Sequence, residues 1–186
     1  IEVDRHLNSS SFEHPPADSS ESVDLDGGFL MPSFGDGHAH PIFGGLEAEG
    51  PQVRACASVA EIVTEVRRFA EANPEVEWIT GASYDGSLVE GGLFDSRWLD
   101  DAAADRPVVL RAWDYHTVWC NSRALEIAGI TAGTPEPELG EIPRRGDGSP
   151  LGTLREWGAV DLVDAVRPPL HEAMRVRALE RAADYY

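Results

Sequence analysis

The stretch FLMPSFGDGHAHP, residues Phe29–Pro41, decides the predicted fold because it brings two histidines together in an otherwise largely apolar segment. His38 and His40 are separated by a single alanine. Side chains of a β-strand alternate between its two faces, so a strand here directs both imidazoles to the same side. Imidazole nitrogen is a common ligand of zinc and other transition metals. The stretch therefore predicts a two-histidine metal clip, although an isolated pair of this kind is also found on ordinary protein surfaces.

Length and charge restrict what the rest of the chain can be. Its 186 residues can bury one core, with or without a small appendage, whereas an eight-stranded β/α barrel typically needs about 250 residues. The formal net charge of −18 argues against nucleic acid or an anionic membrane as a partner, because binding phosphate requires basic patches.

Cysteine usage and the polarity of the N-terminal residues bear on location. Cys56 and Cys120 lie far apart, as expected of buried thiols in a reducing compartment. No segment has the length of a transmembrane helix, and the polar residues 1–20 do not resemble a signal peptide. We therefore expect a cytoplasmic protein.

The first half of the chain predicts an alternation of loops, a helix and strands. Residues 1–22 are expected to form an arm, 23–25 a short strand before a turn at 26–28, and 42–57 a glycine-rich loop. Ser58 followed by Glu61 predicts a capped helix that ends at Asn73. Residues 77–81 predict a short strand that leads into a loop containing Asp85, which is either a functional or a turn-forming residue.

The second half predicts a further strand and several helices. We expect a short helix over 95–104, a buried strand over 108–113, and a helix capped by Asn121 that ends before Gly129. His116 then lies on the connection between that strand and that helix. Residues 130–150 predict a long loop, a helix capped by Thr153 with Glu156 at its third position follows, and a final helix covers 170–186.

Several spaced motifs resemble one enzyme family. The apolar residues before His38 and His40, with Pro32, Phe34 and Asp36, are similar to the first-strand signature of the amidohydrolase superfamily. Further matches follow in the correct order at 78–85, 99–100, 106–111, 116–130 and 147–156. Together they resemble the YtcJ-like branch, which includes N-substituted formamide deformylases.

The resemblance implies an α/β fold, as the N-terminal fragment of a metal-dependent hydrolase of the TIM-barrel type. Residues 1–28 would contain an arm and a remnant of a preceding β-sandwich, and 29–57 the first barrel strand with its loop. An α+β insertion that covers the active-site mouth would occupy 58–165. The helix in 166–186 would lead into the rest of the barrel.

The resemblance also implies the chemistry, which is hydrolysis of an amide-like C–N bond in a small molecule by water activated on a divalent metal, most simply zinc. His38 and His40 would bind the metal, and Glu156 would add a ligand in place of the family's modified lysine, because this chain contains no lysine. The alternative for Glu156 is a helix cap. His116, Asn121 and Asp85 would face the substrate, although His116 could instead anchor its loop.

The resemblance also bears on whether the chain is complete. The general-base aspartate and two more histidine ligands of the family would fall beyond Tyr186, so the chain is expected to be incomplete and inactive alone. A different reading is a non-catalytic α+β binding module in which the histidine pair has lost its role. Self-association is a third expectation, because the helix over 170–186 offers apolar residues for packing.

Overall fold

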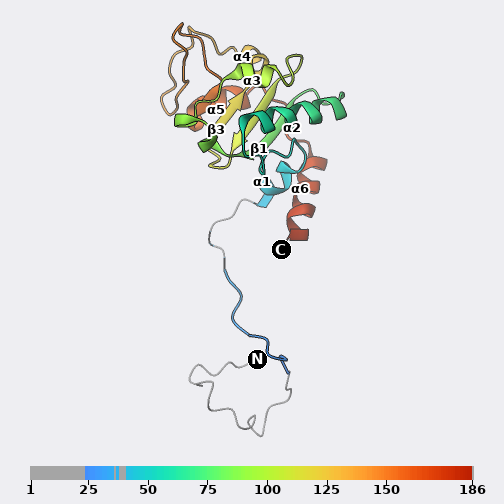
Figure 1. The fold of residues 1–186 in the computed structure, drawn as a ribbon. Helices are drawn as coiled ribbons and strands as arrows, with labels where there is room; N and C mark the ends of the chain where they lie inside the picture. The colour runs from blue at the N-terminus through green and yellow to red at the C-terminus, as the bar shows by residue number, and fades with distance from the viewer. Residues whose placement is uncertain (1–23, 36, 38–40, 186) are drawn as a thin grey trace. The chain divides into compact units, whose positions relative to one another are not determined.

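The structure is a computed structural model that describes residues 24–35, 37 and 41–185 (Figure 1). It divides into two units, residues 1–39 and 40–186. In the first unit the predicted turn is confirmed, since the Gly28 N–H donates to the Leu25 carbonyl at 2.7 Å. Its central residues, Asp26 and Gly27, both have positive φ angles, as a tight reversal requires.

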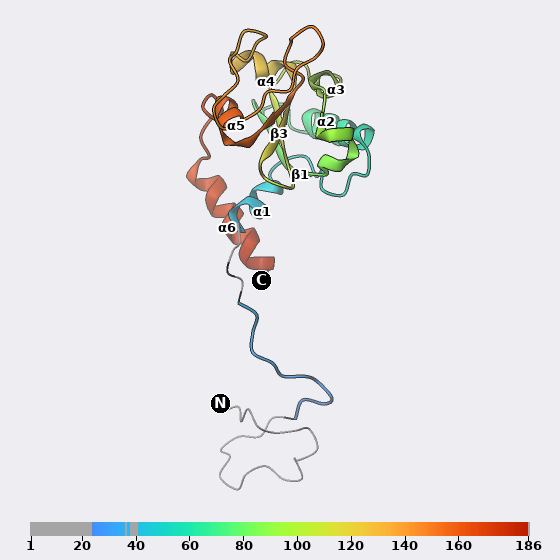
Figure 2. The same ribbon diagram turned by 90° about the vertical axis from the view of Figure 1, so that its left-hand side faces the viewer.

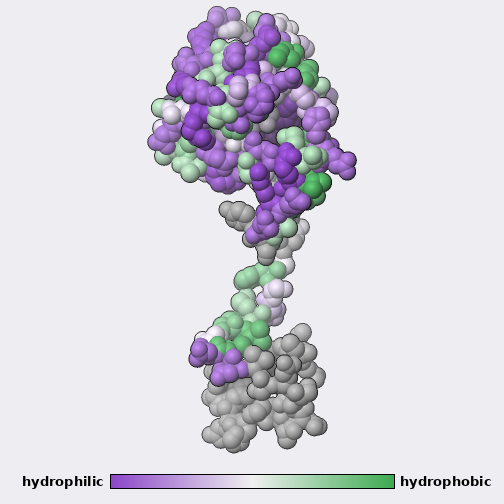
Figure 3. Space-filling model, turned by 90° about the vertical axis from the view of Figure 1, so that its right-hand side faces the viewer, coloured by the Kyte–Doolittle hydropathy of each residue, from purple (hydrophilic) through white to green (hydrophobic). Residues whose placement is uncertain are grey.

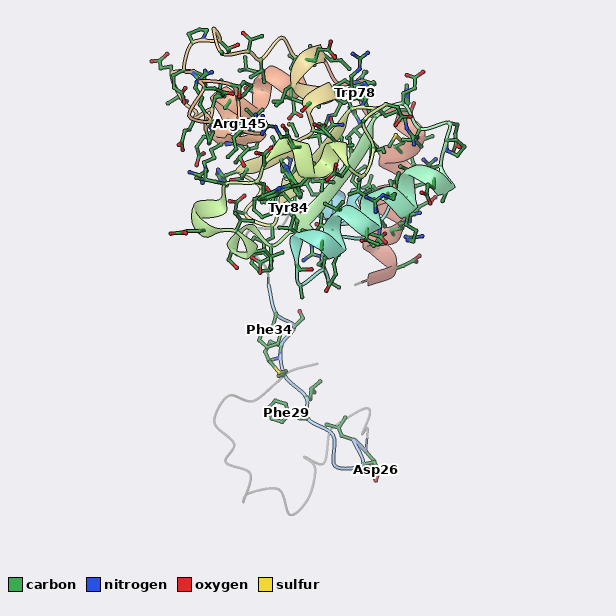
Figure 4. All side chains as sticks on the ribbon, turned by 45° about the horizontal axis from the view of Figure 1, so that its top comes forward. Asp26, Phe29, Phe34, Trp78, Tyr84 and Arg145 are labelled. Atoms are coloured by element: carbon green, nitrogen blue, oxygen red, sulfur yellow. The ribbon has the colours of Figure 1, made fainter. Side chains whose placement is uncertain are left out.

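The strands predicted around this turn are not seen in the described residues. Residues 24–25 and 28–35 have no strand conformation, because no described segment pairs with them. Figure 4 labels Phe29 and Phe34, whose side chains are largely exposed, and Figure 3 shows the apolar character of this segment. Asp36, His38 and His40 lie outside the described residues, so the predicted metal clip stays a prediction.

Helix α1 (Pro41–Glu47) corrects the prediction of a loop after the histidines. Proline favours the first helical position because its fixed φ suits a helix and it has no N–H to leave unpaired. The helix packs against α6 (Glu172–Tyr185), so tertiary burial stabilises a segment that contains two glycines. A Cβ at Gly45 would lie only 2.0 Å from the Ala178 carbonyl oxygen, so the close approach requires glycine.

A four-stranded sheet forms the centre of the second unit, in the order β1-β2-β3-β4. Strand β1 (Ile79–Tyr84) is parallel to β2 (Val108–Ala112). The remaining pairs are antiparallel and involve β3 (Thr117–Cys120) and β4 (Thr153–Arg155). The sequence predicted β1 and β2 but neither β3 nor β4, because such short strands carry little periodicity of their own.

Helices cover both faces of this sheet, as Figures 1 and 2 show. Alternate residues of β2 enter two separate cores, with Leu110 in one and Val109 in the other. The first core includes residues of α2 (Val59–Ala72) and α3 (Ser96–Asp100). The second includes residues of α4 (Ser122–Ile127) and α5 (Glu156–Asp164). Strand β2 is therefore buried on both sides, as its apolar run Val108–Leu110 indicates.

The predicted helix caps are mostly confirmed. The Ser58 hydroxyl accepts from the Glu61 N–H at 3.2 Å, and Asn73 is the C-cap of α2. Asn121 caps α4, and Gly129 follows that helix with a positive φ. Helix α3 is shorter than predicted and is capped by Asp95.

The predicted cap at Thr153 is wrong. Thr153 belongs to β4, and its hydroxyl accepts from the Phe94 N–H at 2.8 Å. Helix α5 begins at Glu156 without any side-chain cap. Pairing with β3 has overridden the local capping motif, which removes the capping explanation for Glu156.

The remaining connections are a long loop after α4 and a short segment between β1 and α3. The long loop after α4 is held by Arg145, labelled in Figure 4, whose guanidinium binds the Asp95 carboxylate and the Leu151 carbonyl. Two short 3₁₀ helices, η1 (Gly86–Leu88) and η2 (Glu90–Gly92), form the connection between β1 and α3. No helix in the described part of the chain is long and apolar enough to cross a membrane.

Tyr84 provides a test of the first core. Its ring lies 4.9 Å from that of Phe94 and 5.9 Å from that of Trp119, while its buried hydroxyl has no hydrogen-bond partner among the described residues. Since a buried, unpaired hydroxyl is costly, Tyr84→Phe should leave the free energy of unfolding unchanged or raise it by about 1 kcal/mol. Tyr84→Ala should lower it by about 3–5 kcal/mol. Urea unfolding measures both, and a large loss in Tyr84→Phe would show that the hydroxyl is satisfied.

Candidate functional site

Three of the four predicted site residues that the structure describes lie at one edge of the sheet. Strand β4 runs antiparallel to β3, which runs antiparallel to β2, so the carboxyl ends of β1, β2 and β4 meet at the same edge. Asp85 follows β1, His116 lies on the connection that follows β2, and Glu156 follows β4. Functional groups of α/β sheets concentrate at such an edge. Asn121, in contrast, follows β3 and lies at the opposite edge.

The β2–β3 hairpin holds His116 in a defined turn. One carboxylate oxygen of Asp114 accepts from the His116 N–H at 2.8 Å and from the Thr117 N–H at 3.0 Å. Tyr115, at the tip of the turn, has a φ of 62°, and its carbonyl accepts from the Arg111 guanidinium at 3.0 Å. The turn is therefore fixed by the side chains of Arg111 and Asp114, which both precede its tip.

His116 and Glu156 form a polar pair at this edge. The His116 Nδ1 lies 3.0 Å from the Glu156 Oε2, and the Glu156 N–H donates to the His116 carbonyl at 2.8 Å. Register explains the contact, because Thr117 of β3 is opposite Arg155 of β4. The His116 ring lies 5.9 Å from the ring of Trp157 in an edge-on arrangement.

Glu156 has an unusual backbone for its residue type. Its φ is 58°, in the left-handed region that side chains other than glycine seldom adopt. Such a conformation costs about 1–3 kcal/mol and persists where surrounding structure determines it. Its side chain is 59% exposed. The Glu156 carboxylate is thus exposed to solvent by a residue whose backbone conformation is itself unfavourable. An α-helix does not require a positive φ at its first residue, so the start of α5 does not explain this conformation.

Glu47, the last residue of α1, accepts hydrogen bonds from three side chains near the same edge. Its Oε1 accepts from the hydroxyls of Ser83 and Tyr115, and Arg54 binds both carboxylate oxygens at 2.6–2.7 Å. Burial would raise the pKa of this carboxyl, but the donors from Ser83, Tyr115 and Arg54 together lower it. The Glu47 side chain is only 12% exposed. It is consequently held as an anion.

Sequence reasoning missed this group because residues 42–57 were expected to be a loop. The available signal was Pro41, whose preference for a first helical turn predicts α1. Ser83 carried no local signal, because its conformation near the end of β1 depends on a shift in the pairing register with β2.

Asn121 and Asp85 have clear local partners. The Asn121 amide is buried, donates to the carbonyls of Ala103 and Arg106 at 2.8 Å, and accepts from the N–H groups of Val108 and Ala124 at 2.9 Å. Asp85 accepts from the Ser87 N–H at 2.7 Å and caps η1. Both residues organise the backbone, and their predicted contacts with a substrate stay predictions.

The metal site can be judged only in part. Among residues 24–35, 37 and 41–185, no three or more histidine, cysteine or acidic side chains gather as a metal site. His38 and His40 lie outside those residues, and Glu156 lies beside His116. Two imidazoles and an exposed carboxylate are nevertheless a donor set that suits zinc. The chemistry of these residues therefore fits a divalent metal.

Comparison with known proteins identifies the family. Residues 21–186 match the model of the amidohydrolase family, so this chain belongs to that family and to its YtcJ-like branch. It is 32% identical over 168 residues to Protein LONG AFTER FAR-RED 3 of Arabidopsis thaliana, covering 90% of this chain and 29% of that protein.

Two bacterial relatives belong to the predicted branch. The putative amidohydrolase YtcJ of Bacillus subtilis is 30% identical over 88% of this chain and 31% of its own length. The N-substituted formamide deformylase of Arthrobacter pascens is 32% identical over 77% of this chain and 27% of its own length. The chain thus spans about a third of the length of these curated relatives.

A solved structure supports the fold. The crystal structure of an uncharacterized metal-dependent hydrolase from Pyrococcus furiosus aligns with a TM-score of 0.51 at 22% sequence identity, covering 83% of this chain and 29% of that one. The predicted α/β class is confirmed at this level. The family match makes the chain a member of a family of hydrolases, and the likeness to this structure supports its fold.

Asn121→Asp tests the role assigned to that amide. The substitution replaces an NH₂ group that donates to two buried carbonyls with an acceptor, so the free energy of unfolding should fall by at least about 2 kcal/mol. Asp85→Asn, which changes a half-buried cap but keeps an acceptor oxygen, is the matched comparison and should cost less than about 1 kcal/mol. Urea unfolding measures both. Full stability of Asn121→Asp would contradict the structural role.

Glu47→Gln tests the anionic state of the Glu47 carboxylate. Because its pKa lies below the ordinary value of 4.5, the anion stabilises the fold above that pH, and this contribution is lost as pH falls through the lowered pKa. The variant should be less stable than the original chain at pH 7, and the difference should shrink toward pH 3. Urea unfolding across this pH range measures it, with Glu71→Gln on the exposed side of α2 as the control. A constant difference would contradict the assignment.

Proposed function

We propose that this chain supplies part of the active site of a metal-dependent hydrolase that cleaves amide-type C–N bonds, such as those of N-formyl or N-acyl amines. Family membership supports the hydrolase class, and the name of the Arthrobacter relative supports the bond type. The observation that carries the proposal is the exposed, left-handed Glu156 at the sheet edge beside His116.

His38, His40 and Glu156 are the residues that would hold the divalent metal, which we propose to be zinc. When bound, such a metal lowers the pKa of a coordinated water toward about 7 and polarises a carbonyl. His116 would orient the Glu156 carboxylate through its Nδ1 contact, as outer partners of metal ligands commonly do. The half-exposed rings of His116 and Trp157 would border the position of a small-molecule substrate.

We further propose that residues 1–186 are not catalytically competent alone. The chain covers 27–31% of the relatives described above, and its described residues contain no gathered metal site. A general-base carboxylate and further ligands would have to come from elsewhere. We also propose a cytoplasmic location, with which the free thiols of Cys56 and Cys120 are compatible.

A binding module without catalysis is the second candidate. It is favoured by one observation, namely that the second unit buries an apolar cluster on each face of its sheet. Under this alternative the histidine pair would bind no metal, which the following experiment decides.

Zinc binding by the 186-residue chain tests the proposed ligands. Calorimetric titration with zinc salt, supported by elemental analysis, should show binding that His38→Ala or His40→Ala abolishes. Glu156→Gln should weaken zinc binding at least about tenfold. His171→Ala, which changes an exposed histidine before α6, is the control and should bind like the original chain. Equal affinity in Glu156→Gln would remove Glu156 from the site, and no zinc binding in the original chain would favour the binding module.

Activity tests the second half of the proposal. The chain loaded with zinc should show no turnover of N-substituted formamides or simple N-acyl amines above that of free zinc. Zinc-dependent turnover that His38→Ala abolishes would contradict the proposed incompleteness while supporting the reaction class.

A further inference from the structure

Glu47 connects two segments that both lead to proposed functional residues. Helix α1 begins directly after His40 and ends at Glu47, while Tyr115, which donates to Glu47, directly precedes His116. The connection joins residues 68 positions apart in sequence. Its acceptor is a nearly buried carboxylate, so the hydrogen bonds are shielded from competing water.

Both hydroxyl donors to Glu47 occupy left-handed backbone conformations. Ser83 has a φ of 67° at the irregularity in β1, and Tyr115 has a φ of 62° in the β2–β3 hairpin. A non-glycine residue keeps such a conformation only where its surroundings compensate the cost. Arg54 adds to the same group, because it donates to Ser83 Oγ at 2.8 Å as well as to Glu47.

The hairpin is also held at its other side. Arg111 donates to the Tyr115 carbonyl at 3.0 Å and forms an ion pair with Asp164 of α5 at 3.1 Å. Helix α5 begins at Glu156. The Tyr115 hydroxyl is thus fixed by α1, and its carbonyl is fixed by Arg111, which is itself paired with Asp164 of the helix that Glu156 begins.

We propose that Glu47 is a positioning residue that acts through Tyr115 on the hairpin and sets the contact between His116 and Glu156. Its significance for catalysis rests on the proposed function, but its effect on the hairpin does not require a metal. Loss of the Glu47 acceptor should allow the strained turn at Tyr115 to change conformation. The backbone hydrogen bond from the Glu156 N–H to the His116 carbonyl should then be weakened.

Glu49 provides a matched control. It lies two residues after Glu47 and its carboxylate binds Arg177 and Arg181 of α6 at 3.1 Å and 2.6 Å. Glu49→Ala therefore removes an acidic side chain that attaches the same region to α6, without removing an acceptor of the hairpin.

Amide hydrogen exchange by NMR tests the proposal on the 186-residue chain without metal. Glu47→Ala and Tyr115→Phe should each accelerate exchange of the Glu156 and Thr117 amides at least tenfold, relative to the core amides of β2. Glu49→Ala should not. Glu47→Gln, which keeps an acceptor oxygen, should restore part of the protection. Unchanged exchange at Glu156 and Thr117 in both Glu47→Ala and Tyr115→Phe would overturn the proposal.

Two further measurements keep the outcome decisive. If Glu47→Ala does not fold, Tyr115→Phe decides, because it removes one hydroxyl and keeps the ring that lies 5.3 Å from Phe43. Zinc titration of Tyr115→Phe should then show affinity reduced several-fold. Faster amide exchange with unchanged zinc affinity would overturn the link between Glu47 and the metal site. Absence of zinc binding in the original chain would refute the proposed function. In that case the exchange rates alone would test whether Glu47 positions the hairpin.

Discussion

The pairing of β4 with β3 is the constraint on which the candidate site depends. It places Arg155 opposite Thr117, and this register brings Glu156 beside His116 although the two residues are 40 positions apart. The same pairing turns Thr153 into a strand residue and starts α5 at an uncapped Glu156. A local sequence that favours a capped helix is thereby converted into a strand end that exposes a carboxylate.

Backbone strain gathers at the edge formed by this pairing. Ser83 near the end of β1, Tyr115 after β2 and Glu156 after β4 all have positive φ angles without being glycine. Strain of this kind must be compensated by neighbouring contacts, and it is frequently retained where a side chain has to point in a particular direction. Here the compensating contacts are the Glu47 acceptor and the β3–β4 ladder. The sheet edge is therefore organised by more than burial of apolar surface.

Sequence patterns predicted the parts of the fold whose signals are local. The cap at Ser58, the cap at Asn121 and the apolar run of β2 each depend on neighbouring residues, and each was found close to its expected position. The missed elements depend on distant partners. Strand β3 is short and depends on pairing with β2 and β4, and β4 depends on pairing with β3. Helix α1 is stabilised by contact with α6, although its proline was a usable signal.

The site was predictable in its residue types but not in its arrangement. Motifs named His116 and Glu156 separately, yet only the sheet shows that they touch, and only the topology separates Asn121 from them. We propose that Glu156 binds the metal together with His38 and His40. A crystal structure of the zinc-loaded chain, with zinc located by anomalous scattering, tests this ligand set. Zinc is expected at about 2.0–2.2 Å from a Glu156 carboxylate oxygen and from two imidazole nitrogens. Zinc bound without Glu156 would refute the proposed ligand set.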